Sequence, residues 1–393
     1  MSRRRRWLFW LLVDLLALLA LLWIDRSLGA NRPSPGGLVS PSPTPSADQY
    51  AQRAEAAYRA GDLRGAEEGY RLALSLEPEN PARYPPLIRL LAFTNRLDEA
   101  AIWMERARRL APEDPGILGM ATLILDWQGR VSEAIQAGER AVAQAPDSGP
   151  LHAYLAEAYA DAHRPQSALA AAQKAVALAP EHPDVHRALG YVYETLGRYA
   201  EAMGAYREAL NRDPNMVVVW LALGRNALVL RQTAVAVDAF QRAAALRPED
   251  PRVLDELGWL YYNLGRLEEA QQTLERAREY GPDDWRILYH LGITLYARRQ
   301  YEEVVQEDRL PRGIARLQTI LQQEGRSCTP DTAGGEPRCA RLVEMAYILG
   351  LSQYYLGNCA AARPWFELAL SISPQEENAL KGLRLCEEGS GRP

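Results

Sequence analysis

Apolar side chains recur at helical spacing along most of the chain. Between residues 183 and 216, two runs fit the i, i+3, i+4, i+7 spacing of amphipathic helices: Val185, Leu189, Val192 and Tyr193, then Ala202, Tyr206, Ala209 and Leu210. Gly197 lies between the two runs and supplies a backbone conformation that ends a helix. Pro214 follows the second run and cannot continue a helix. This segment is therefore predicted to form two antiparallel helices joined by a short turn.

The same pattern returns with a strict period of 34 residues. Its markers are an alanine, a second alanine seven positions later, and a proline five positions after that. The first alanine stands at Ala66, Ala100, Ala134, Ala168, Ala202, Ala236 and Ala270. A strict period of this length indicates a solenoid of stacked helix pairs. Seven ungapped repeats are predicted over residues 47–284.

The residues within each period resemble those of the tetratricopeptide repeat (TPR) family. The first-helix pattern of the family is visible as Leu189-Gly190 with Tyr193, and as Leu257-Gly258 with Tyr261. The second helix carries the family's aromatic position at Tyr70, Tyr206, Phe240 and Phe366. The resemblance implies an all-α, right-handed α-solenoid of about nine helix-turn-helix repeats that binds a protein or peptide partner in its concave groove. A fold of this kind does not by itself define a function.

The period fails near the C-terminal end. Residues 285–342 span 58 positions where one repeat needs 34, so an insertion of 24 residues is predicted there. The displaced second helix is expected at residues 314–323, and residues 325–338 are expected to form a protruding loop. A final repeat is predicted over residues 343–376, followed by a cap helix and tail over residues 377–393.

The N-terminus is predicted to anchor the chain in a membrane. Residues 1–6 form a basic stub, residues 7–24 an apolar run of about the length that spans a bilayer, and residues 25–46 a Pro/Ser-rich linker. The basic stub should stay in the cytoplasm, which places the repeats on the extracytoplasmic side. A cleaved signal peptide is the alternative to a single-pass signal-anchor.

All four cysteines lie in the last fifth of the chain, at Cys328, Cys339, Cys359 and Cys386. An even number in a chain predicted to leave the cytoplasm favours disulfide bonds. Four cysteines allow three pairings. The preferred one is Cys328–Cys339, which would close the inserted loop, with Cys359–Cys386, which would join the last repeat to its cap helix. A metal site is the alternative, although the paired C-x-x-C spacing of zinc or iron sites is missing.

The resemblance also indicates where a partner binds, because fixed positions of each first helix line the groove of TPR proteins. In the early repeats these positions hold a mixed set that includes Glu55, Arg89, Leu123 and Glu157. In the later repeats they hold aromatic and arginine side chains, which carry much of the binding energy at protein interfaces. The predicted partner-binding groove comprises Tyr191, Arg252, Trp259, Tyr262, Arg286, Tyr289, Tyr296, Tyr347, Tyr354 and Tyr355. The alternative is that several of these tyrosines pack between neighbouring helices.

Composition and motifs narrow the function further. The formal net charge of −5, with acids and bases mixed along the chain, argues against nucleic acid as the main partner. His182 and His186 stand four apart, but Pro183 separates them, so no metal site is predicted there. The inner positions lack the asparagines used by chaperone-clamping TPR domains and by glycosyltransferase solenoids. No catalytic site, cofactor, metal or small-molecule substrate is expected.

The sequence therefore predicts a non-enzymatic, membrane-tethered, extracytoplasmic scaffold that binds a protein or peptide. Resemblance to other anchored repeat proteins suggests a role as an assembly factor. One alternative is a redox or metal-dependent module acting through the cysteine-bearing insertion. Another is a cytoplasmic-facing adaptor with the opposite membrane topology.

Overall fold

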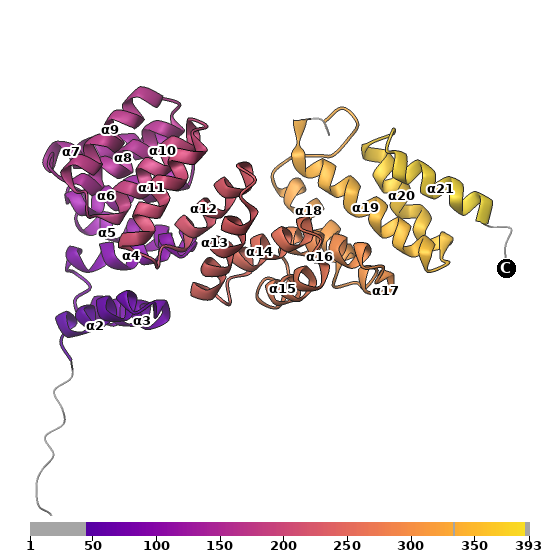
Figure 1. Ribbon diagram of the computed structural model, residues 1–393, viewed down its shortest axis with the longest axis horizontal. Coiled ribbons are helices and arrows are strands. Elements are labelled where there is room, and N and C mark those ends of the chain that lie inside the picture. Colours follow the sequence, from indigo (N-terminus) through magenta and orange to yellow (C-terminus); the bar gives the residue numbers. More distant parts are fainter. Residues whose placement is uncertain (1–44, 333–334, 390–393) are drawn as a thin grey trace, which may run out of the picture. The chain divides into compact units, whose positions relative to one another are not determined.

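The computed structural model describes residues 45–332 and 335–389, whose regular elements are all helices (Figure 1). Seven helix pairs come first: α2 (Ala47–Arg59) with α3 (Leu63–Leu76), α4 (Tyr84–Phe93) with α5 (Leu97–Leu110), α6 (Pro115–Trp127) with α7 (Val131–Gln144), α8 (Gly149–Asp161) with α9 (Pro165–Leu178), α10 (Pro183–Thr195) with α11 (Tyr199–Arg212), α12 (Val217–Val229) with α13 (Thr233–Leu246), and α14 (Pro251–Asn263) with α15 (Leu267–Tyr280). A 3-10 turn, Pro81–Arg83, precedes α4.

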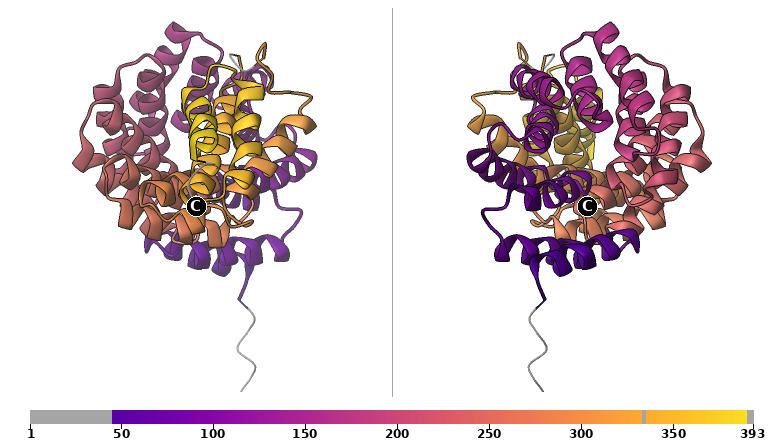
Figure 2. Two further views of the ribbon diagram at one scale, coloured as in Figure 1. Left: turned by 90° about the vertical axis from the view of Figure 1, so that its right-hand side faces the viewer. Right: turned by 90° about the vertical axis from the view of Figure 1, so that its left-hand side faces the viewer.

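Six further helices complete the described part of the chain: α16 (Trp285–Ala297), α17 (Tyr301–Val304), α18 (Leu310–Gln323), α19 (Pro337–Tyr355), α20 (Cys359–Ile372) and α21 (Glu377–Gly389). In both views of Figure 2, successive helices follow one another in chain order, and only short connections separate them over most of the ribbon. The prediction of an all-helical solenoid is confirmed for the described residues.

The periodic residues are those at which the two helices of a pair approach most closely. The seven first alanines, from Ala66 to Ala270, are fully buried. The glycine of the Leu-Gly pattern faces the aromatic ring of the second helix, because a Cβ at Gly190 would lie 2.6 Å from Tyr206. The same contact would be 2.6 Å between Gly350 and Phe366. Any larger residue at these glycines would force the helices apart.

The turn within each repeat needs one residue in the left-handed backbone region. Glycine supplies it in alternate repeats, at Gly61, Gly129, Gly197 and Gly265, with φ between 71° and 81°. The repeats between them use a residue with a side chain at the corresponding position: Asn95, His163, Arg231 and Arg299, with φ between 55° and 64°. The left-handed turn conformation therefore recurs every 34 residues, although glycine occupies it only in every second repeat.

The eighth repeat departs from the pattern in its second helix. The segment that should form this helix contains only the four-residue α17. Helix α18 takes its place against α16, with Leu310 and Leu317 fully buried. A Cβ at Gly292 of α16 would lie 2.6 Å from Leu310, which repeats the glycine contact of the regular pairs. The chain thus restores the missing helix with a segment further along the sequence.

Helix α19 begins six residues before the predicted start of the final repeat at residue 343. Pro337 occupies its first turn, and the Glu336 side chain accepts a hydrogen bond from the Arg338 backbone N–H. Both features favour the start of a helix. Cys339 of this extra turn is bonded to Cys328, and Cys359 of α20 is bonded to Cys386 of α21. The structure thus contains the pairing that the sequence favours.

The predicted basic stub at residues 1–6, the membrane span at residues 7–24 and nearly all of the linker at residues 25–46 lie outside the described residues. Among the helices that the structure does describe, none is both long enough and apolar enough to cross a membrane.

Candidate functional site

Two predicted groove residues of α14, Trp259 and Tyr262, form a compact aromatic stack with His290 of α16, which was not among the predicted residues. The Trp259 ring stacks on Tyr262 with 4.9 Å between centroids and on His290 with 4.2 Å. Trp259 and Tyr262 are partly buried, so each ring rests against the core and leaves part of its surface open. Such half-exposed aromatic rings are suited to contact a partner.

A second group of aromatic rings lies on α16, α17 and α19. Tyr301 and Tyr355 stack with 4.7 Å between centroids, and Tyr296 lies 5.7 Å from Tyr301. Tyr354 meets the Tyr355 ring edge-on at 5.5 Å. Tyr355 is 51% exposed, whereas the other three tyrosines are partly buried. The sequence analysis did not include Tyr301, because α17 belongs to the irregular repeat.

Tyr347 of α19 is partly buried and packs against the same hydrophobic cluster as Trp259, Tyr262 and Tyr296, so the two groups share one core. Burial raises the pKa of Tyr347 to about 12, and the neighbouring Glu344 carboxylate adds to the effect. The phenol therefore stays neutral at physiological pH and can donate a hydrogen bond. We call the combined surface the aromatic platform; it comprises Trp259, Tyr262, Tyr296, Tyr301, Tyr347, Tyr354 and Tyr355.

Tyr289 and Tyr191 belong to the predicted groove but not to the platform. Tyr289 is only 2% exposed, and its hydroxyl lies 2.5 Å from a Glu344 carboxylate oxygen, which accepts its hydrogen bond. Burial and this carboxylate raise the pKa of Tyr289 well above its usual range. Tyr191 lies on α10 and donates a hydrogen bond to Asp161. For Tyr289, the alternative of packing between helices describes the structure better, whereas Tyr191 is partly buried and lies three repeats away from the platform's α16.

The two predicted arginines lie beside Trp259, around a cavity of about 490 Å³ that His290 also lines. Both Arg252 and Arg286 are exposed. The Arg286 guanidinium lies 3.6 Å from the Asp284 carboxylate, and Arg252 forms no ion pair with any described residue. This edge of the platform therefore combines an aromatic surface with a free positive charge.

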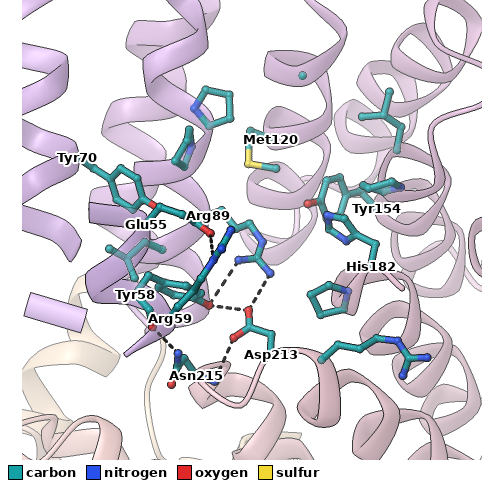
Figure 3. Close-up of a pocket in the computed structure, with 18 of the residues that line it drawn as sticks. Glu55, Tyr58, Arg59, Tyr70, Arg89, Met120, Tyr154, His182, Asp213 and Asn215 are labelled. Carbon is teal, nitrogen blue, oxygen red and sulfur yellow. Dashed lines mark hydrogen bonds and ion pairs between the residues drawn. The ribbon is translucent and has the colours of Figure 1, made fainter. Parts of the chain in front are cut away.

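The early repeats place charged side chains in the corresponding positions, and these bond to one another across the groove. Arg89 of α4 donates to Asp184 at 2.6 Å and to Asp213 at 3.2 Å. The Tyr58 hydroxyl donates to Asp213 at 2.7 Å, as Figure 3 shows. Burial alone would raise the pKa of Asp184, but the Arg89 guanidinium outweighs burial and holds that pKa well below its usual range. We call Tyr58, Arg89, Asp184, Asp213 and Asn215 the Arg89 network.

The Arg89 network joins repeats that are far apart in the sequence. Asn215 donates to the backbone oxygen of Tyr58 at 2.5 Å, and Arg64 lies 2.8 Å from Glu249 in an exposed ion pair. Helix α12 also contacts α4 directly. The first two repeats are thereby fastened to the fifth and sixth.

A second group of charged side chains, formed by Arg187 and Glu157, lies in the same groove one repeat further along. Arg187 donates to Glu157 at 2.7 Å, and both side chains are nearly fully buried. The Arg187 guanidinium also lies over the rings of Phe93 and Trp127, at 5.0 Å and 5.3 Å from their centroids. A buried ion pair of this kind needs complete bonding to be tolerated.

Bonding in this part of the groove is incomplete at Arg187, whose buried Nε has no hydrogen-bond partner among the described residues, and at Asp126. Asp126 is 2% exposed, and neither of its carboxylate oxygens has a hydrogen-bond partner among the described residues. Burial, together with the charges of Glu157 and Asp161, raises the pKa of Asp126 to about 8. At neutral pH this side chain is therefore mostly an uncharged carboxylic acid.

Sequence reasoning had placed Arg89 and Glu157 in the groove as part of a mixed set and had assigned them no role. A usable signal was nevertheless present. Tyr154 bonds to Asp184 and Glu157 to Arg187, and both pairs are separated by 30 residues in the sequence. This spacing joins neighbouring first helices, so complementary groups 30 positions apart predict such bonds.

The sequence comparisons agree with this geometry. A family model described as Tetratricopeptide repeat matches residues 155–217, and a second model of the same description matches residues 227–298. These two segments are similar to the TPR family. TPR proteins generally act as non-enzymatic scaffolds for protein interactions. No curated protein matches the chain.

Three solved structures are similar to parts of this chain. The crystal structure of the APC/C hetero-tetramer Cut9-Hcn1 covers 83% of this chain with a TM-score of 0.57 and 16% identity. This chain spans 59% of the length of that chain, and such a likeness shows the fold alone. YrrB, a TPR protein with an unusual peptide-binding site, covers 54% of this chain and is itself covered to 97%, with a TM-score of 0.42 and 18% identity. The C-terminal part of a TPR repeat-containing protein from Cytophaga hutchinsonii covers 67% and is covered to 99%, with a TM-score of 0.48 and 17% identity.

Proposed function

We propose that this protein is a membrane-tethered scaffold that binds an extended segment of a protein partner on its aromatic platform. The observation that carries the proposal is the platform itself, in which two groups of half-buried or exposed aromatic rings from α14, α16, α17 and α19 lie over one hydrophobic cluster. Large aromatic rings held by a rigid scaffold provide binding area with little loss of conformational entropy.

The chemistry of the platform indicates the kind of segment that would bind. Ring faces favour apolar, aromatic or proline side chains, and the hydroxyl groups of Tyr347 and Tyr354 can donate to backbone carbonyl oxygens of an extended chain. Arg252, which forms no ion pair with any described residue, would accommodate an acidic residue at one end. The partner segment is therefore apolar, with a carboxylate near one end.

Photo-crosslinking tests this proposal directly. A benzophenone amino acid at Tyr355 should capture a defined partner from intact membranes, because this ring is 51% exposed on the platform. The matched control is the same substitution at Tyr280, which is 46% exposed at the end of α15 and outside the platform. Crosslinks of equal yield at both positions would contradict the proposal.

Two substitutions define the platform's contribution. Trp259→Ala and Tyr354→Ala should each lower recovery of the crosslinked partner at least tenfold, in line with the loss expected for a central aromatic residue. Circular dichroism must show an unchanged helix content in both variants. Unchanged recovery from a folded variant would rule out the platform as the binding site.

The location of the scaffold is a part of the proposal with its own test. The apolar run at residues 7–24 and the arginines before it favour a single-pass anchor with the repeats outside the cytoplasm. A reporter that is active only outside the cytoplasm, fused to the C-terminus, should be active. A silent reporter would favour the opposite topology. A role as an assembly factor follows if the captured partner is a subunit of a larger envelope complex.

The alternative, a redox or metal-dependent module, would act through the cysteines. All four cysteines of the chain are joined in disulfide bonds. Thiol titration under native conditions separates the two functions, because the scaffold needs no free thiol and the redox module does.

A further inference from the structure

A cavity of about 620 Å³ lies beside the Arg89 network, far from the aromatic platform in the sequence (Figure 3). Its walls come mainly from the first helices of repeats one to five and from the loop between α11 and α12, with Tyr70 of α3 and Arg212 of α11. The cavity exists because the Arg89 network brings the loop at Asp213 and Asn215 against Tyr58. Its volume lies in the range of pockets that enclose a small organic molecule.

Much of the wall is apolar and built from flat rings. Prolines at or near the starts of four first helices line it, and three tyrosines and Met120 complete the apolar surface. The prolines are Pro85, Pro86, Pro150, Pro183 and Pro214, and the tyrosines are Tyr58, Tyr70 and Tyr154. Pyrrolidine and phenol rings both offer flat surfaces on which an aromatic ring can stack.

The charged groups of the wall are already paired. Arg59 lies 2.9 Å from Glu55, Arg89 lies 3.2 Å from Asp213, and Arg212 lies 2.6 Å from Glu208. A charged ligand would lose its hydration on entering and would meet no unpaired charge in return. The electrostatics of the cavity therefore favour an uncharged occupant.

Two polar groups of the wall have spare hydrogen-bonding capacity: the Arg212 Nε–H, which has no hydrogen-bond partner among the described residues, and the neutral ring of His182. The Nδ1 atom of His182 accepts a hydrogen bond from the Asp184 backbone N–H at 3.3 Å, so the proton of the neutral ring lies on Nε2. Burial lowers the pKa of His182, which keeps the ring neutral. The Nε2–H has no partner among the described residues and is available as a donor.

We propose that this cavity binds a small, uncharged aromatic molecule that accepts a hydrogen bond from His182. This inference goes beyond the proposed scaffold function, which involves a different surface. The occupant would contact the first repeat and the loop that follows the fifth, so its binding would strengthen the connection that the Arg89 network makes.

Three probes with one aromatic body and different charges test the proposal on the purified full-length chain. They are indole-3-acetamide, which is neutral, indole-3-acetate, which is an anion, and tryptamine, which is a cation. Isothermal titration calorimetry should give saturable binding of the amide, with at least tenfold weaker binding of the two ions. Absence of binding by the amide at millimolar concentration, or tighter binding by either ion, would overturn the proposal.

Substitutions then locate the site. Met120→Trp should fill the cavity and abolish binding of the amide. Gly116→Leu provides a second block, because a Cβ there approaches only the Oδ1 atom of Asp114, at 3.2 Å, and the added side chain would extend into the cavity. His182→Asn retains a helix-capping oxygen but removes the Nε2–H, and should weaken binding about tenfold. The control Trp259→Ala, on the platform, should leave the affinity unchanged. Unaltered binding in both blocking variants would contradict the assignment.

Discussion

The two ends of the solenoid use the same groove positions in opposite ways. In repeats two to five these positions hold Arg89, Glu157 and Arg187, whose charges are satisfied by other groups of the chain. In repeats seven to nine they hold Trp259, Tyr296, Tyr354 and other rings that are only partly covered. The early groove is therefore closed by internal bonds, whereas the late groove retains surface that only another molecule can cover. A partner surface is found where the chain leaves its own groups incompletely packed.

Among the substitutions that compare the two ends, Arg89→Met is expected to change the free energy of unfolding most. The substitution removes the cation shared by Asp184 and Asp213 and leaves two buried carboxylates with hydrogen-bond donors but without the arginine's positive charge. We expect the free energy of unfolding to fall by about 3–5 kcal/mol. Urea denaturation followed by circular dichroism measures this change. The control Arg252→Met, at an exposed arginine beside the platform, should change it by less than about 0.5 kcal/mol. Equal losses would refute the contrast.

At the C-terminal end, the disulfide between α20 and α21 is expected to contribute most. Replacing both Cys359 and Cys386 by serine opens a bond that spans 27 residues of sequence. The chain-entropy estimate for such a loop is about 3 kcal/mol. Relative to the wild type, hydrogen–deuterium exchange should become faster in α20 and α21. The exchange rate in α6 should not change, because each repeat contacts mainly its neighbours. Faster exchange throughout the chain would show that the two ends are not independent.

Asp126→Asn should stabilise the early repeats at neutral pH. The native pKa of Asp126 is about 8 and its usual value is 3.8, so the unfolded chain releases this proton at much lower pH than the folded chain does. Stability from this group is complete below pH 4 and is lost as the pH rises toward 8. The amide avoids that loss, and we expect a gain of up to about 4 kcal/mol at pH 7.

The pH dependence of stability provides the control for the gain expected from Asp126→Asn. The difference between Asp126→Asn and the wild type should disappear near pH 4 in thermal denaturation. Asp238→Asn, at an exposed carboxylate 3.4 Å from Arg242, should show no comparable gain at either pH. A gain at Asp126 that does not vary with pH would mean that burial does not keep this carboxyl neutral.

The smallest expected effect is that of Tyr58→Phe. The variant loses the 2.7 Å hydrogen bond to Asp213 but retains the ring. We expect a loss of about 1 kcal/mol in the free energy of unfolding. Tyr159→Phe, whose hydroxyl donates to the surface carboxylate of Glu139 at 3.0 Å, is the matched control and should lose less. If the two variants lose equally, the Arg89 network does not hold the first repeat.

The fold could be predicted from the sequence because its signals are local. Helix spacing, the Ala–Ala–Pro period and the contact between Gly190 and Tyr206 all lie within one repeat. Within the eighth repeat, Val304 and Asp308 stood at positions that require an alanine and an aromatic residue. This local conflict sufficed to predict a displaced second helix, which the structure places at Leu310–Gln323.

The candidate site was harder to predict because exposure depends on neighbouring repeats. Two residues predicted to line the groove differ in exposure. Trp259 is half-exposed, whereas Tyr289 is buried and donates a hydrogen bond to Glu344, which lies 55 residues away in the sequence. The Arg89 network depends on how far the solenoid turns between the first and the sixth repeat. No periodicity within a single repeat encodes that rotation, so its bonds between residues more than 90 positions apart could not be foreseen.

The alternation at the turns has a consequence for how the molecule opens. A residue with a side chain in the left-handed region is less favourable than glycine by about 1 kcal/mol. Asn95, His163, Arg231 and Arg299 each carry this penalty, and the glycine turns between them do not. At this position the true period is therefore 68 residues, and every second hairpin is the weaker one. Thermal breathing of the solenoid would begin at these four turns, so that the helix pairs loosen in an alternating order.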